Sequence, residues 1–298
     1  MSIFTLDLNF LGISGAIAAY LVPHSGGAVL IESGPGSTIE ALQAGLAAHG
    51  YAVQDITDVF LTHIHLDHAG ASGWLARQGA RIHVHPVGAP HLLDPEKLLT
   101  SAQRIYGDQM ERLWGEFLPV PEVQLSVLHD GDVIEINGLR LQVIDTPGHA
   151  DHHNVYLMDE VCFSGDIGGV RLAGSRHLRL PMPPPEFHLE KWRASLNRLY
   201  TLDLRRIAPT HFGLFDDVGW HLAAIARELD TVQGWIETTL PENPDLDTLT
   251  ERFLAWVKDR SQEDGVEPAQ IDVFELANPS WMSPLGIQRY WRKYRSGA

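Results

Sequence analysis

The sequence predicts a mixed α/β fold of the α+β kind, followed by a helical extension at the C-terminus. Up to residue 208, short apolar runs typical of strands alternate with Gly- and Pro-containing turns and with helical patterns. Beyond Asp216, apolar residues recur every three or four positions, which is typical of amphipathic helices. We therefore expect a catalytic domain at residues 1–215 and a helical extension at residues 216–298.

Composition limits the classes of function and partner. The chain has 298 residues, of which 44% are hydrophobic, so it can bury a sizeable core. Its formal net charge of -16 at pH 7 and the lack of a basic tract disfavour nucleic acid as a partner. The single cysteine, Cys162, excludes an intrachain disulfide framework and fits a reducing cytoplasm. Because the sequence shows no signal peptide or membrane span, we expect a cytoplasmic protein with no membrane partner.

The residue pattern in the first third of the chain predicts strands that lead to a metal-binding loop. Apolar runs between residues 3 and 31 indicate an antiparallel meander, and a helix should follow from about residue 37 to residue 49. The run at residues 58–62 predicts a buried strand. The next six residues, His-Ile-His-Leu-Asp-His at 63–68, carry three imidazoles and a carboxylate, a set that suits a borderline metal such as zinc.

The geometry of an extended chain divides these side chains. His63, His65 and Asp67 share one side of a period-two backbone, whereas His68 points elsewhere. That divergence can serve two metal ions instead of one. A second His-x-His pair, His83 and His85, lies on the next predicted strand without a third ligand nearby in sequence, so we interpret it as packing.

A helical insertion interrupts the strands at about residues 86–121. One helix with a broad apolar face is predicted from Pro95 to Phe117. Most of that face should cover the core, although part of it, including Tyr106, could wall a substrate pocket. Strands then resume between residues 123 and 163, and they present His149 and Asp166 in the loops that follow them.

A long loop at residues 168–188 follows Asp166. Loops next to a fixed site usually carry specificity. We therefore expect Arg171, Arg176, His177 and Arg179 to contact the substrate, with the arginines binding an anionic end. The alternative is an ordered surface connection stiffened by proline.

The last predicted strand ends at Pro-Thr-His, with His211 as its final residue, and only helices are expected beyond it. Their apolar stripes fall in three groups, at residues 218–236, 246–257 and 287–294. These helices could cap the site, dock on the first domain or form a homodimer contact. Docking is favoured because each stripe must be buried somewhere.

Four motifs together make residues 1–215 resemble the metallo-β-lactamase fold superfamily, in its glyoxalase II-like and lactonase-like branch. They are His-Ile-His-Leu-Asp-His (63–68), Asp-Thr-Pro-Gly-His (145–149), Phe-Ser-Gly-Asp (163–166) and Ala-Pro-Thr-His (208–211). The resemblance implies an αββα sandwich with metals at one edge between the sheets. It also implies a ligand set in which Asp166 bridges two metals, one bound by His63, His65 and His149, the other by Asp67, His68 and His211. The family usually has Asp where this chain has Glu32, which we interpret as a support for the ligands.

The resemblance implies a hydrolase with two divalent metal ions per chain, zinc first, with iron or manganese as alternatives. A water shared by two cations would become the nucleophile, and Asp67 would be the catalytic residue that handles its proton. The expected substrate is a small ester, thioester or lactone. Alternatives are a mononuclear iron oxygenase acting on a persulfide, a phosphodiesterase and a non-catalytic scaffold. The glyoxalase II thioester is one candidate, although that family's basic recognition residues are not identifiable here.

Overall fold

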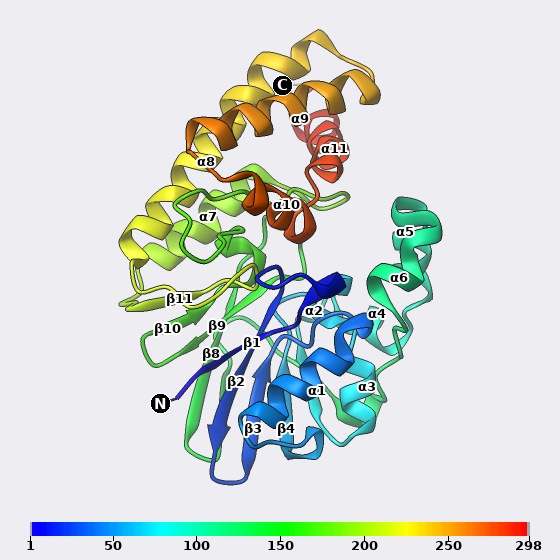
Figure 1. Ribbon diagram of the computed structural model, residues 1–298, viewed down its shortest axis with the longest axis vertical. Coiled ribbons are helices and arrows are strands. Elements are labelled where there is room, and N and C mark those ends of the chain that lie inside the picture. Colours follow the sequence, from blue (N-terminus) through cyan, green and yellow to red (C-terminus); the bar gives the residue numbers. More distant parts are fainter. Residues whose placement is uncertain (1, 297–298) are drawn as a thin grey trace.

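The computed structural model describes residues 2–296 (Figure 1), so residues 1 and 297–298 of the two predicted regions lie outside the described part. Within residues 2–296, eleven strands form two sheets, ordered β1-β2-β3-β4-β5-β6 and β11-β10-β9-β8-β7. The strands of the first sheet are β1 (Phe4–Asp7), β2 (Ala18–His24), β3 (Gly27–Ile31), β4 (Ile56–Phe60), β5 (Arg81–Val84) and β6 (Leu125–Val127). The strands of the second sheet are β7 (Val133–Ile136), β8 (Leu139–Asp145), β9 (Asn154–Met158), β10 (Val161–Phe163) and β11 (Arg206–Ala208).

Alternate residues of the strands face two different cores. In β2, Ala18 and Tyr20 pack between the sheets, whereas Ala19 and Leu21 face the opposite way. This alternation follows from the period-two geometry of a strand. Helices cover both outer faces of the pair of sheets: α1 (Ile39–Ala48) and α3 (Ser72–Arg77) on the first sheet, α7 (Leu189–Tyr200) on the second. The predicted αββα sandwich is confirmed.

The insertion contains three short helices where the sequence predicted one. They are α4 (Ala89–Leu93), α5 (Glu96–Tyr106) and α6 (Met110–Trp114). Gly107 stops α5 with a φ of +52°, and a 3-10 turn follows it. Such a φ is unfavourable for side chains with a Cβ atom but open to glycine. The single helix from Pro95 to Phe117 is therefore a wrong prediction.

The turn at residues 130–131 carries the chain from one sheet to the other. The strand before it, β6, is a parallel partner of β5, whereas the strand after it, β7, pairs with β8 in the second sheet. The Asn-Gly turn at residues 137–138 joins β7 to β8 as an antiparallel hairpin, as expected for that dipeptide.

Four α-helices lie in the described part of the C-terminal extension, residues 216–296, one more than its three apolar stripes predicted. They are α8 (Val218–Thr239), α9 (Leu246–Glu263), α10 (Pro268–Ala277) and α11 (Ser283–Tyr294). The unexpected helix, α10, fully buries only Phe274 and Ala277, so its sequence carries no continuous apolar stripe. No helix of residues 2–296 is long and apolar enough to cross a membrane.

The extension docks on the sandwich. Apolar residues of α8, α9 and α11 form one core with α7 and the outer face of the second sheet, as Leu196, Ile225, Phe253 and Ile287 illustrate. Phe274 of α10 instead joins the core of the first sheet. The division into residues 1–215 and 216–298 stays a prediction, but the two parts share hydrophobic cores, and α10 approaches the edge where β4 ends (Figure 1).

Candidate metal centre

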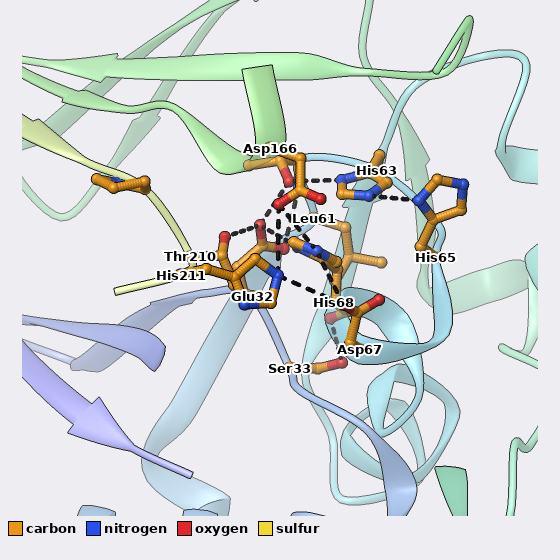
Figure 2. Close-up of polar contacts among 12 residues, drawn as sticks. Glu32, Ser33, Leu61, His63, His65, Asp67, His68, Asp166, Thr210 and His211 are labelled. Carbon is orange, nitrogen blue, oxygen red and sulfur yellow. Dashed lines mark hydrogen bonds and ion pairs between the residues drawn. The ribbon is translucent and has the colours of Figure 1, made fainter. Parts of the chain in front are cut away.

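The seven predicted ligands meet at one edge of the sandwich. They lie on four segments, which follow β4, β8, β10 and β11. The short helix α2 (Leu66–Ala69) carries two of them, and a 3-10 turn at Gly165–Gly168 carries Asp166. Figure 2 shows Asp166, which follows β10 of the second sheet, facing His63 and His68, which follow β4 of the first sheet.

Three histidines form the first cluster. His65 Nδ1 lies 2.9 Å from both His63 Nε2 and His149 Nε2, and these two Nε2 atoms are 3.2 Å apart. Around a tetrahedral zinc ion with Zn–N distances of about 2.0–2.1 Å, nitrogen ligands are roughly 3.3 Å apart. The spacing of the three nitrogens is therefore close to that of ligands around one ion, and the three residues form a group that could hold a metal.

Asp67, His68 and His211 form the second cluster. Asp67 Oδ2 lies 3.6 Å from His68 Nε2 and 3.4 Å from His211 Nε2. Asp166 lies between the clusters: its Oδ1 atom is 3.3 Å from His68 Nε2, and its Oδ2 atom is 3.4 Å from His149 Nε2. The structure thus brings together the two ligand groups that the resemblance implies, and a third possible group, His63, His68 and Asp166, overlaps them.

Three buried atoms at the meeting point have no hydrogen-bond partner in the described part of the chain: His68 Nε2, His211 Nε2 and Asp166 Oδ1. A buried polar atom without a partner costs roughly 1–3 kcal/mol. All three atoms belong to residue types that bind divalent metals, and Asp166 Oδ1 lies 3.3 Å from His68 Nε2 and 3.5 Å from His211 Nε2. A cation at this position would satisfy all three, so the residues present fit a divalent metal centre.

Oxygen atoms contact the Nδ1 side of three imidazoles, away from the centre, and so orient the rings. His149 Nδ1 donates to Pro181 O at 2.9 Å, and His211 Nδ1 donates to Ala16 O at 2.7 Å. His68 Nδ1 lies 3.0 Å from a carboxylate oxygen of Glu32. Because an oxygen atom holds Nδ1 of each ring, Nε2 faces the centre, the usual arrangement for a metal-binding histidine.

Glu32 supports the centre without entering it. Its side chain is fully buried and also accepts hydrogen bonds from the hydroxyls of Thr62, at 2.5 Å, and Thr210, at 3.0 Å. One carboxylate therefore ties the loops after β4 and β11 to α2, and Figure 2 shows Glu32 beside His68 and Thr210. This position agrees with the supporting role predicted for Glu32.

Burial and neighbouring charges set the protonation of the clusters. Burial, with His68 and His65 beside it, holds the pKa of His63 well below its usual range, and burial and His149 lower the pKa of His65 to about 4. Both imidazoles are therefore neutral at pH 7 and able to bind metal. Burial alone would raise the pKa of Asp67, but His68 and His211 lower it to about 2, so this carboxylate is ionised.

A cavity of about 270 Å³ opens beside the centre, and His65, Asp67, His149 and Asp166 are part of its wall. Its other walls come from α5, α6, the proline-rich residues 181–186 and the C-terminal residues 276–283. Tyr106 lines the cavity, consistent with its predicted contact to substrate.

The other predicted substrate residues do not reach the cavity. Arg171 is buried and binds both carboxylate oxygens of Asp217, at 2.6 and 2.8 Å. His177 Nδ1 lies 2.7 Å from a carboxylate oxygen of Asp264, and the side chain of Arg176 is 71% exposed. We correct the prediction for Arg171, Arg176 and His177, because the two buried side chains are engaged by acidic residues of the C-terminal extension and Arg176 faces solvent.

Other histidines near the site have structural partners. His83 stacks on Phe60 and contacts Asp58 at 2.8 Å, which confirms its interpretation as packing. His153 contacts the Thr146 hydroxyl at 2.9 Å and is not part of a candidate ligand group. Sequence reasoning did not single out His152 as a cavity residue, and it missed residues 276–283 entirely, because no local motif marks either.

Two sheets between helices, with a cluster of histidines and aspartates at their edge, define an αββα sandwich with a candidate metal centre. Residues 13–211 match the model of the metallo-beta-lactamase superfamily, and the chain belongs to this superfamily. Solved structures share the fold. A metallo-beta-lactamase family protein from Thermus thermophilus superposes with a TM-score of 0.65 at 22% identity, covering 98% of this chain and 93% of that one.

Curated relatives cover less of the sequence. The chain is 28% identical over 160 residues to a metallo-beta-lactamase fold-containing protein of Sulfurisphaera tokodaii (52% of this chain, 60% of that protein). It is 29% identical over 219 residues to an atrochrysone carboxyl ACP thioesterase of Aspergillus fumigatus (72% and 55%). It is 25% identical over 249 residues to a hydroxyacylglutathione hydrolase of Ectopseudomonas mendocina (80% and 84%). The chain thus spans less than two thirds of the first two relatives.

Proposed function

We propose that this protein is a metal-dependent hydrolase that holds two divalent metal ions per chain and cleaves a small ester, thioester or lactone. The observation that carries the proposal is the meeting of two ligand groups around Asp166 in the wall of a cavity. The names of two relatives, a thioesterase and a hydroxyacylglutathione hydrolase, support hydrolysis at an acyl group.

The roles of the residues follow from their positions. His63, His65 and His149 would hold one ion, Asp67, His68 and His211 the other, and Asp166 would contact both. Zinc is the first choice, with iron or manganese as alternatives, because histidine and carboxylate ligands serve all three metals. When bound, such ions supply a Lewis acid for the substrate carbonyl and lower the pKa of water towards neutrality.

Asp67 would move the proton. Its carboxylate is ionised at pH 7 and faces the cavity, with 21% of the side chain exposed. It can therefore accept a proton from the attacking water. It can then deliver this proton to the leaving group, at the oxygen of an alcohol or the sulfur of a thiol. Burial and the charge of Asp67 raise the pKa of Tyr106, so this phenol keeps its proton and can donate a hydrogen bond to the substrate.

Elemental analysis and a substrate panel test the proposal. Protein prepared without added metal, and protein loaded with zinc, iron or manganese, would be assayed on thioesters, esters, lactones, penicillins and phosphodiesters. We expect two metals per chain and turnover of esters, thioesters or lactones. One iron per chain with oxygen uptake on a persulfide would replace the hydrolase with the iron oxygenase, and turnover of phosphodiesters alone would replace it with a phosphodiesterase.

The proposed partner is a small molecule, since the net charge of -16 opposes nucleic acid. The proposed compartment is a reducing cytoplasm, where the one buried cysteine, Cys162, would stay a thiol. Burial also raises the pKa of Cys162 to about 12, so this thiol is a packing residue and not a nucleophile.

A further inference from the structure

The outer part of the cavity is built from apolar side chains of two segments that lie outside the sheets. Helix α5 contributes Leu98, Ala102 and Ile105, which are spaced so that they share one helix face. The C-terminal segment contributes Leu276 and Met282. The cavity therefore runs from the metal centre into an apolar space between the insertion and the extension.

The insertion and the extension touch each other beside this space. The hydroxyl of Tyr106 lies 3.2 Å from the Met282 sulfur, and the rings of Tyr106 and Trp281 are 6.2 Å apart. On its other side, Tyr106 packs edge-on against Trp114 at 5.0 Å. Residues 276–283 thus complete a wall that the sandwich alone does not supply.

The charges around the cavity do not suit an anionic substrate group. Among the described lining residues, Lys97 is the one lysine or arginine, and it is exposed. Glu186, which also lines the cavity, carries the opposite charge. Moving a carboxylate from water into an apolar space without a cationic partner is strongly unfavourable. An uncharged group meets no such penalty and gains from contact with apolar walls.

We propose that the space between α5 and residues 276–283 binds an apolar, uncharged acyl group of the substrate. The substrate class is then an aliphatic or aromatic acyl ester, thioester or lactone, and this inference rests on the proposed hydrolase function. A volume of about 270 Å³ corresponds to roughly nine water molecules at about 30 Å³ each, room for an acyl chain of about eight carbons.

A series of p-nitrophenyl esters tests the substrate class on the metal-loaded protein. Each buried methylene should raise kcat/KM about fourfold, so the hexanoyl ester, with four more methylenes, should exceed the acetyl ester about 250-fold. The adipoyl monoester, which has the length of hexanoyl but ends in a carboxylate, should be at least about tenfold worse than hexanoyl. Equal rates for acetyl and hexanoyl, or faster cleavage of adipoyl, would overturn the inference.

Two substitutions on α5 locate the acyl group. Ala102→Phe fills the apolar space and should lower the ratio of kcat/KM for the hexanoyl ester to kcat/KM for the acetyl ester at least about tenfold. Thr100→Phe is the matched control, because Thr100 is exposed on the same helix and does not line the cavity. An equal effect of Ala102→Phe on both esters would contradict the proposed position. Leu276→Ala probes the opposite wall and should lower kcat/KM for the hexanoyl ester about tenfold. This variant tests the position of the acyl group even if the Ala102→Phe protein does not fold.

A binding measurement separates this inference from the proposed function. Hexanamide and adipamic acid, titrated into the metal-loaded protein by calorimetry, compare a neutral and an anionic end without hydrolysis. We expect hexanamide to bind at least about tenfold more tightly, and to lose this advantage in Ala102→Phe. Selective hexanamide binding without turnover of any ester, thioester or lactone would reject the hydrolase and keep the acyl site. Ester turnover without chain-length preference and without selective binding would reject the acyl site and keep the hydrolase.

Discussion

Two clusters of histidines and charged residues, the metal centre and the group on the loop after Asp166, differ in how their polar atoms are satisfied. In the metal centre, His68 Nε2, His211 Nε2 and Asp166 Oδ1 are buried without a hydrogen-bond partner among the described residues. In the second cluster, formed by Arg171, His177 and Arg179, the buried polar groups are paired with the C-terminal extension.

The second cluster shows what a structural set of charges looks like. Arg179 donates to Glu275, Ser280 and Ser261, and Arg171 stacks on the ring of Phe215 at 4.0 Å in addition to its bidentate pair. Composition alone would assign a ligand role to either cluster. Converging buried atoms without partners mark the site, because a folded chain rarely leaves such atoms unless a ligand completes them.

Asp67→Asn should have the largest effect. The amide keeps the size of the carboxylate but cannot accept the proton, so kcat should fall about 10²- to 10⁴-fold while most of the metal stays bound. Steady-state kinetics and elemental analysis on the same preparations would measure both quantities. His68→Ala is the comparison variant, expected to lose metal from one position. If Asp67→Asn keeps both metals and turns over normally, the proton role of Asp67 is wrong.

His221 should make stability depend on pH. Its Nε2 donates to Gly168 O at 2.8 Å on the turn that carries Asp166, and burial lowers its pKa from 6.5 to about 4. Arg171, which lies 3.4 Å from Nδ1, also opposes protonation, whereas Asp217 favours it. Above pH 6.5 the imidazole is neutral in both states and its contribution is complete. Between pH 6.5 and 4 only the unfolded chain takes up the proton, so stability falls as the pH falls.

Urea unfolding of wild type and His221→Gln at pH 7 and pH 4.5 measures this contribution. Glutamine can still donate to the Gly168 carbonyl but does not titrate. The wild type should therefore lose about 2–3 kcal/mol more than the variant between the two pH values. The same pH dependence in both proteins would mean that His221 titrates with an ordinary pKa.

Arg171→Met separates the structural cluster from the site. The change leaves Asp217 without its partner and should cost about 2 kcal/mol of unfolding free energy, less than for a fully buried pair because the Asp217 side chain is 30% exposed. Metal content and KM should not change. Arg176→Ala, on the exposed part of the same loop, should stay within about 0.5 kcal/mol. A raised KM in Arg171→Met with unchanged stability would mean that Arg171 does contact the substrate.

Glu32→Gln should have the smallest effect. One carboxylate oxygen becomes an NH₂ group facing the Thr62 backbone N–H, which donates to it at 3.2 Å, while the other oxygen can still accept from His68. Metal affinity should fall about tenfold, in the range typical of residues that orient ligands. Competition with a chelator would measure it. An unchanged affinity would show that the position of His68 does not depend on Glu32.

The sequence by itself determined the strand pattern and, through its resemblance to the superfamily, the sandwich architecture and the candidate ligands. Strand patterns have a period of two residues, and the ligands occur in short motifs directly after strands, so both signals are local in the chain. Once β4, β8, β10 and β11 end at the same edge, His63, His149, Asp166 and His211 must lie near one another. The Gly107 break in α5 and the helix α10 escaped prediction, because a single glycine and a weak apolar stripe are ambiguous signals.

Only the tertiary structure decided which charged residues reach the substrate. Arg171 pairs with a residue 46 positions away, His177 with one 87 positions away, and Arg179 with one 96 positions away. No local pattern encodes such pairs, because they depend on how the C-terminal helices pack against the sandwich. The same packing brings residues 276–283 to the cavity and makes its outer wall apolar. The sequence states which residues carry a charge. Whether a charged side chain can bind substrate or is already paired depends on residues far along the chain, which only the fold brings into contact.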